Sequence, residues 1–435
     1  MKRLLSVLML LTVMTAAIFA SGSKESAPKT ESKVVTTVCR ASYADEEWYK
    51  TMNADFEKET GIHVEVIPTP GNDEDHDSLL NTWLLSGEKF DVIPSLGPKF
   101  YQDRVEAGFF LPLNDLFASA GVDAKGIWGA NLQDEDGTYY SVPTKQELWC
   151  IFYNKDLFDK AGVAYPEGSW TWDEYIETAK KVTNLDEGIY GSYMNIENPW
   201  TILPAKQLDV PLYKEDGTCN FDAPEFREAI KWYYDLGNTL KVQMPVDEVV
   251  NENASWNYYA ISGDRLAMFP QGNWFTRLLN SQTDYPRDWK YGVAPLPSTP
   301  NGGNNNMISL GYVSINKNAA HPDEAFTYLI WLGENQWKYE KGIPALATLT
   351  EEQQQQVFSS IAEASNGQVT VEDLYNSWIN TGLGAAQSDI VGVAANEYNR
   401  IANSELQAYF MDLQDIDTTI NNIVTKVNEA IKNSK

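Results

Sequence analysis

Short apolar runs alternate with amphipathic stretches in the first quarter of the chain. Val34–Val38 has the β-branched composition of a strand, and Ile62–Ile67 alternates apolar and polar residues as a second strand. Between them, residues 47–60 show the apolar spacing of a helix, which Gly61 ends. A buried strand is expected at Phe90–Pro94. This strand–helix–strand order predicts a parallel α/β sheet.

The middle of the chain contains a polar break between two apolar runs. We expect a short strand at Tyr139–Val142 that stops at Pro143, because proline cannot donate to a sheet ladder. An unbroken apolar strand follows at Leu148–Tyr153. Gln146 and Glu147 lie in the polar stretch between the two runs. We interpret this break as the junction of two packed units, and clefts that bind small molecules form at such junctions.

Length and composition agree with two packed units. The 435 residues exceed what one hydrophobic core organises, so two domains are expected. The 23 tyrosines and 14 tryptophans favour a site in which aromatic rings stack on a ligand. The three cysteines form neither a disulfide framework nor a metal-binding pattern, although the sequence is compatible with one disulfide between two of them. We expect no metal and no cofactor.

The first 33 residues predict export. Lys2 and Arg3 precede an apolar stretch, Leu4–Phe19, and small residues follow it. This order predicts a secretory signal peptide at 1–20, and the alternative is a buried N-terminal helix. The polar, proline-containing residues 21–33 predict a flexible leader. No cysteine lies near the cleavage point, so we expect a secreted, periplasmic protein without a lipid anchor.

The charge balance is strongly acidic. The chain has 33 Lys and Arg against 61 Asp and Glu, a net charge of −28. Such a chain is repelled by nucleic acid and by anionic membrane surfaces, so we expect neither as a partner.

Several segments, in order, resemble one family. These segments are FDVIPSLGPKFYQDRVEAGFFLPLNDLF, IFYNKDLFDKAG with SWTWDEYIETAKKVT, GDRLAMFPQGNW, YGVAPLP with LGYVSINKNAAHPDEAFTYLIWL, and YEKGIPA. Together they are similar to the extracellular solute-binding proteins of carbohydrate ABC importers, the maltose-binding-protein-like family. Each motif alone is weak, but the series covers nearly the whole chain after the leader. The chain departs from many relatives in having no lipidated cysteine.

The resemblance implies an α/β fold with two lobes, the periplasmic-binding-protein fold. Each lobe would be a mainly parallel sheet flanked by helices, and hinge crossings would join the lobes. Residues 34–144 with 310–365 would form the N-terminal lobe, and residues 145–309 with 366–435 the C-terminal lobe. The resemblance further implies a monomeric, non-enzymatic receptor. It would close on a sugar or oligosaccharide and deliver it to the membrane permease of an ABC importer.

A sugar site needs an aromatic platform and fixed hydrogen-bonding groups. Trp274 follows Asn273 at a strand end and is the best platform candidate, a choice that rests mainly on the resemblance. The other candidates lie at crossings, at strand ends or in an irregular loop, and each has a structural alternative such as a core position, a sheet position or a surface loop. They are Gln146, Glu147, Ser42, Tyr43, Glu46, Ser95, Leu96, Asn273, Gly311, Tyr312 and Trp200.

Two other function classes stay open at this point. A secreted glycosidase would need two carboxylates about the scissile bond, and 61 acidic residues make a chance pair easy to find. A receptor for an anion such as a sugar phosphate would need a basic cluster. The candidate loops contain Arg40 and Lys145 but no cluster, so a neutral sugar is the preferred ligand.

Overall fold

The computed structural model describes residues 33–434 except 72, 133–136, 198, 253–260, 262 and 301. The predicted signal peptide at 1–20 lies outside these residues, as does the predicted leader at 21–33 apart from Lys33. Within the described ranges, no helix is both long enough and apolar enough to span a membrane.

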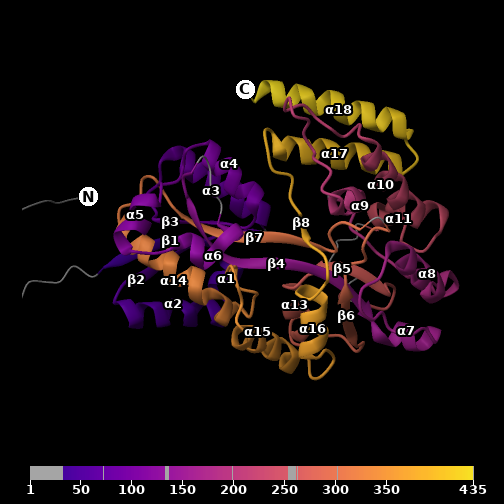
Figure 1. The fold of residues 1–435 in the computed structure, drawn as a ribbon, viewed down its shortest axis with the longest axis horizontal. Coiled ribbons are helices and arrows are strands. Elements are labelled where there is room, and N and C mark those ends of the chain that lie inside the picture. The colour runs from indigo at the N-terminus through magenta and orange to yellow at the C-terminus, as the bar shows by residue number, and fades with distance from the viewer. Residues whose placement is uncertain are drawn as a thin grey trace, which may run out of the picture.

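The strands form a sheet of eight that extends through both halves of the molecule (Figure 1). Its order is β2-β1-β3-β7-β4-β5, with β6 also paired to β4 and β8 to β7. The strands are β1 (Val34–Arg40), β2 (His63–Thr69), β3 (Val92–Ser95), β4 (Ser141–Asn154), β5 (Met268–Gly272), β6 (Tyr291–Pro295), β7 (Asn306–Ile315) and β8 (Ala385–Gln387).

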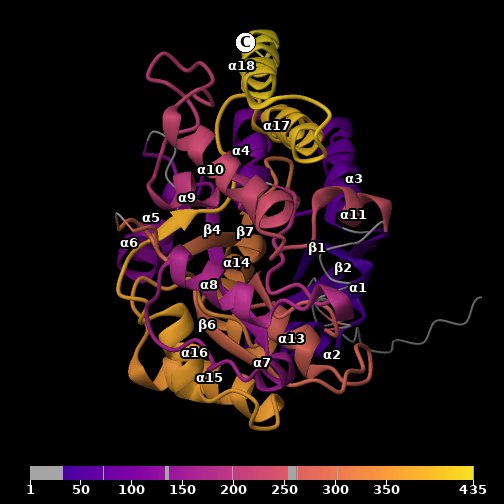
Figure 2. The same cartoon turned by 90° about the vertical axis from the view of Figure 1, so that its right-hand side faces the viewer.

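Helices cover both halves of this sheet (Figures 1 and 2). The helices of the first half and its return are α1 (Ala41–Ala44), α2 (Glu47–Thr60), α3 (Asp73–Ser86), α4 (Pro98–Glu106), α5 (Asn114–Ala120), α6 (Ala124–Trp128), η1 (Gly129–Asn131) and α14 (Pro322–Glu340). The others are α7 (Lys155–Ala161), α8 (Trp172–Val182), η2 (Leu185–Glu187), η3 (Trp200–Ile202), α9 (Leu203–Gln207), α10 (Pro224–Tyr234), η4 (Asp235–Thr239), α11 (Val246–Asn251), α13 (Phe275–Asn280), α15 (Glu351–Ala364), α16 (Val371–Trp378), α17 (Ala395–Phe410) and α18 (Ile416–Asn433).

The first lobe is built as the sequence predicts. β1 pairs in parallel with β2 and β3, and α2 and α3 connect these strands. The two faces of the sheet have separate cores, one around Phe56 and Trp128 and the other around Leu80 and Tyr101. The opening helix and strand pattern therefore produces a sheet with a helix layer on each face.

The prediction of mainly parallel sheets in both lobes is wrong for the second lobe. β4 pairs antiparallel with β5, β6 and β7, and β3 pairs antiparallel with β7. The returning strand β7 enters the first lobe from the second, so it runs against the strands of the opening unit. Hydrophobic patterning reports burial but not strand direction, which is why the sequence did not reveal this pairing.

One continuous strand replaces the predicted break at Pro143. β4 carries the chain from the first lobe into the second, and its hydrogen-bond register shifts between Pro143 and Lys145. This irregularity accommodates proline within the ladder, as bulges commonly do. β7 runs back beside β4 and continues through Gly311 without interruption. The two strands lie side by side between the lobes (Figure 1).

The predicted lobe boundary at residue 365 does not match the packing of α15. Val357, Phe358 and Ile361 of this helix belong to a core that contains Phe152 and Phe275 of the second lobe. We therefore propose that the chain crosses into the second lobe between α14 and α15. An amphipathic helix pattern predicts that a helix is buried on one face, but not which core it covers.

Candidate functional site

A cavity of about 1240 Å³ lies where the two lobes face each other. Its walls come from the ends of β1 and β3 in the first lobe, from both crossing strands, and from α13 in the second lobe. The predicted residues that line this cavity are Ser42, Tyr43, Glu46, Leu96, Glu147, Gly311 and Trp274. Residues more than 200 positions apart in the chain therefore meet at one site.

Three further candidates line smaller neighbouring spaces. Ser95 and Tyr312 border a cavity of about 70 Å³ on the first-lobe side. Asn273 borders a side chamber of about 350 Å³ between the lobes. The Asn273 carboxamide oxygen accepts a hydrogen bond from the backbone N–H of Leu148 at 3.1 Å, so this side chain holds β4 against the turn before α13.

Gln146 and Trp200 border none of these three spaces. The Gln146 carboxamide donates to the backbone carbonyl of Pro344 at 3.1 Å and thereby ties β4 to the segment after α14. Trp200 is 9% exposed and packs in the core of the second lobe, 6.5 Å from the ring of Trp149. Trp200 therefore occupies a core position, which was the structural alternative to a ligand contact.

The cavity also contains residues that were not among the predicted site residues. Arg40, Lys145, Arg277 and Ser309 line it. A signal for Arg277 was present, since it lies three residues after Trp274 at the start of α13, and residues at that spacing share a helix face. Lys145 lies in the polar stretch next to Gln146, but the sequence alone does not tell which members of that stretch turn toward the cleft.

Trp274 is held by its neighbours as a platform at the cavity wall. A Cβ atom at Gly272 would lie 2.5 Å from the indole nitrogen of Trp274, so only glycine leaves room for the ring. The ring also meets Phe275 edge to face at 5.7 Å. One side of the indole is thus fixed by the protein, and Trp274 is partly exposed. This arrangement suits stacking on the C–H face of a sugar.

Lys145 lies at the meeting point of all three spaces. Its ammonium nitrogen is 2.6 Å from a carboxylate oxygen of Glu340 and 3.1 Å from one of Glu147. Burial disfavours the charged lysine, but the carboxylates of Glu340 and Glu147 outweigh burial and raise the pKa of Lys145. Burial likewise opposes the charge of Glu340, and Lys145 outweighs it, so the pKa of Glu340 is lowered. Lys145 and Glu340 are therefore both charged at neutral pH.

Arg277 bridges the two lobes. Its guanidinium donates to a carboxylate oxygen of Glu46 at 2.9 Å, and Glu46 lies between α1 and α2 of the first lobe. The ring of Tyr43 lies close by, with its centroid 4.0 Å from the guanidinium carbon of Arg40 and 5.7 Å from that of Arg277. Burial raises the pKa of the Tyr43 hydroxyl, which stays protonated and can donate to a ligand.

Acidic groups outnumber basic groups along the cavity. The lining contains Asp45, Glu46, Glu47, Glu147 and Asp284 against Arg40, Lys145 and Arg277. Two of these cations already form ion pairs with carboxylates. Within the described part of the chain, no three His, Cys, Asp or Glu residues gather as a metal site. The surface offers many hydrogen-bonding groups without a net attraction for anions.

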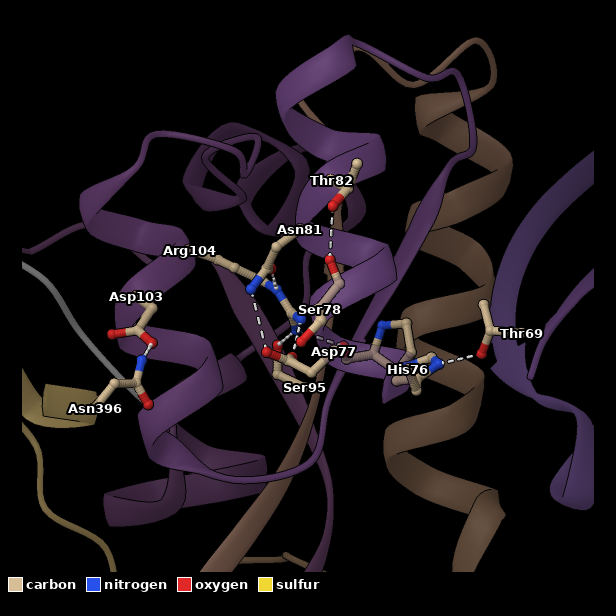
Figure 3. A network of polar contacts seen from close by, with 11 residues as sticks. Thr69, His76, Asp77, Ser78, Asn81, Thr82, Ser95, Asp103, Arg104 and Asn396 are labelled. Atoms are coloured by element: carbon tan, nitrogen blue, oxygen red, sulfur yellow. Dashed lines mark hydrogen bonds and ion pairs between the residues drawn. The ribbon is translucent and has the colours of Figure 1, made fainter. Parts of the chain in front are cut away.

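A buried network fixes the strand end that borders the cavity. Arg104 is 2% exposed and donates to the carbonyl of Pro94 at 3.0 Å and to the hydroxyl of Ser95 at 3.1 Å. It also binds Asn81 at 3.0 Å and forms an ion pair with Asp77 (Figure 3). These bonds hold the end of β3, from which Leu96 enters the cavity wall.

The family described as bacterial extracellular solute-binding protein matches residues 41–339, more than half of the chain. The chain belongs to this family. The family consists of binding proteins, and its description places its members outside the cell.

Curated relatives are distant and match only part of the chain. An arabinooligosaccharide-binding protein of Halalkalibacterium halodurans is 28% identical over 49% of this chain and 46% of that protein. A multiple sugar-binding protein of Streptococcus mutans is 25% identical over 73% of this chain and 76% of that protein. The first of these matches thus spans about half of the relative's length.

Solved structures confirm the two-lobed fold. An ABC substrate-binding protein from Listeria monocytogenes in complex with cycloalternan has a TM-score of 0.77 at 19% identity, covering 92% of this chain and 100% of that one. Maltose-bound MalE3 of T. maritima has a TM-score of 0.67 at 21% identity, covering 91% and 98%. The predicted family and the predicted two-lobed α/β fold are therefore confirmed.

Proposed function

We propose that this chain is a receptor that captures a neutral sugar or oligosaccharide between its lobes and delivers it to an ABC importer. The observation that carries the proposal is the interlobe cavity of about 1240 Å³, which has a fixed indole at one wall and polar groups from both lobes. Ligand contacts to both lobes favour the closed arrangement over the open one, and closure presents the loaded receptor to its membrane partner.

The size and chemistry of the cavity support a polyhydroxyl ligand. Its volume exceeds the range of about 300–1,000 Å³ that is typical of drug-sized ligand pockets, which leaves room for more than one sugar unit. Trp274 supplies an apolar face, while Glu147 and Tyr43 supply acceptors and donors for hydroxyl groups. Relatives whose names specify arabinooligosaccharides or multiple sugars point the same way.

The paired cations argue against an anionic ligand. Lys145 and Arg277 are neutralised by Glu340, Glu147 and Glu46, so a phosphate group would have to displace a carboxylate. The family assignment argues against a glycosidase, and we propose that the chain has no catalytic activity. We also propose that residues 1–20 direct secretion, that the receptor acts as a monomer, and that its partner is the importer's permease.

Thermal unfolding with a panel of neutral mono- and oligosaccharides tests this function. A ligand that binds only the folded protein raises the melting temperature, by an amount that grows with ligand concentration. We expect at least one neutral sugar to do so and sugar phosphates to have no effect. Incubation with the same sugars should return them unchanged. Hydrolysis of a sugar would refute the receptor function in favour of an enzyme.

A further inference from the structure

Two polar contacts join the lobes on different sides of the crossing strands. The first is the Glu46–Arg277 ion pair, whose side chains are both 39% exposed and both line the 1240 Å³ cavity. The second joins the Asp103 carboxylate of α4 to the Asn396 carboxamide of α17 (Figure 3). Neither Asp103 nor Asn396 borders the cavity. One contact therefore lies inside the binding site and the other outside it.

The geometry of the first contact leaves capacity for a ligand. The observed bond to Glu46 uses one of the five N–H donors of the Arg277 guanidinium. Arg277 also borders the side chamber of about 350 Å³, as do Glu46 and Trp274. The pair thus lines both spaces, as does the aromatic platform Trp274. A guanidinium and a carboxylate in this position can each bind a hydroxyl pair with charge-assisted hydrogen bonds.

We propose that Glu46 and Arg277 form a gate that a neutral saccharide engages on entering, so that this pair sets which sugars bind. In the same proposal, the Asp103–Asn396 contact sets only how readily the lobes close. The inference rests on the sugar-binding function proposed above. It adds Arg277 as a residue that determines specificity and separates selectivity from closure in the structure.

The two roles predict different patterns across ligands. A contact that affects closure alone changes the fraction of binding-competent receptor, so it multiplies every dissociation constant by the same factor. A contact with the ligand changes each dissociation constant by an amount that depends on the hydroxyl groups presented. Loss of one charge-assisted hydrogen bond corresponds to a change of about tenfold or more.

Calorimetric titration with arabinotriose, maltotriose, raffinose and mannitol compares the parent with Arg277→Gln, Glu46→Gln and Asp103→Ala. We expect Arg277→Gln and Glu46→Gln to change the ratio of dissociation constants between at least two probes by about tenfold. Asp103→Ala should weaken every bound probe by one common factor. A uniform factor for Arg277→Gln, or altered ratios for Asp103→Ala, would overturn the inference.

Arg227→Gln is the matched control. Arg227 of α10 pairs with Asp417 of α18 at 2.6 Å, on the surface of the second lobe and away from the cavity. This variant should leave every dissociation constant unchanged. Fluorophores placed on the two lobes provide a readout without sugar, in which Asp103→Ala should lengthen the mean interlobe distance. An unchanged distance contradicts the closure role of the Asp103–Asn396 contact, whereas a parent that binds none of the probes contradicts the sugar-binding function.

Discussion

Replacing Lys145 with methionine should destabilise the protein strongly at neutral pH. The side chains of Lys145 and Glu340 are 11% and 9% exposed, so the substitution leaves a buried carboxylate without its cation. Removing one partner of a buried ion pair costs about 3–5 kcal/mol. Glu147 is 21% exposed and reaches more solvent, so its loss of a partner adds less. We therefore expect the free energy of unfolding of Lys145→Met to fall by about 3–5 kcal/mol at pH 7.

The pH dependence separates this electrostatic cause from simple loss of packing. The pKa of Glu340 is lower in the folded parent than in the unfolded chain, where it is about 4.3. The contribution of Glu340 to the free energy of unfolding is therefore present above a pH of about 4.3 and is lost as the pH falls through the pKa of the folded state. The parent therefore keeps this contribution between pH 7 and pH 5. In Lys145→Met, burial still raises the pKa of Glu340, and only the hydrogen bond from Gln336 and the charge of Arg277 oppose it. This variant should therefore recover stability as pH falls from 7 to 5.

Urea unfolding followed by tryptophan fluorescence measures these differences. The double variant Lys145→Met with Glu340→Gln removes both charges and should be more stable at pH 7 than Lys145→Met alone. The reasoning is refuted if Lys145→Met lies within about 1 kcal/mol of the parent, which is the range of an exposed ion pair. It is also refuted if Glu340→Gln gives no rescue.

Two further predictions concern the platform and a buried histidine. Gly272→Ala should displace the indole of Trp274, because a Cβ atom would lie 2.5 Å from the indole nitrogen. In calorimetric titration it should weaken sugar binding by about as much as Trp274→Ala, roughly 0.5–1.5 kcal/mol. Trp172→Ala, at a core position 2% exposed, should lower stability and leave the dissociation constant of the folded protein unchanged. Burial, Arg104 and Arg40 lower the pKa of His76 to about 4. Between pH 6.5 and 4 the unfolded chain then binds a proton that the folded chain does not, so the free energy of unfolding of the parent should fall by up to about 3 kcal/mol over that range. Urea unfolding of the parent and of His76→Gln measures this loss. A difference between the two proteins that does not change with pH would contradict the prediction.

Local elements were predictable because local patterns specify them. Apolar residues that recur every three or four positions near the C-terminus give α18, where Ile420, Ile423, Val427 and Ile431 are buried. Thr171 and Glu174, three residues apart, likewise form a capping box at the start of α8. Strand direction and the lobe to which α15 belongs were not predictable, because both depend on contacts between distant segments.

The candidate site likewise contains some residues that the sequence indicates and others that only the tertiary fold brings together. Trp274 follows mainly from the family resemblance, supported by its place at a strand end, and Glu147 follows from the polar crossing, which is a local signal. Glu340 was not predicted at all, since it is the last residue of a long helix and meets Lys145 only through the tertiary fold. Gln146 and Glu147 are adjacent on one strand, so their side chains point to opposite faces, and the sequence alone does not tell which face meets the cleft.

The crossing strands also separate the order of synthesis from the order of folding. β3 pairs with β7, which lies more than 200 residues later in the chain, so the first lobe stays incomplete until much of the second has been made. The core that Ile151 of β4 begins is finished by Ile431 of α18. Contacts between such distant residues form slowly. A ribosome-bound fragment that ends before residue 300 therefore contains no complete lobe, and both lobes reach their native pairing late and together.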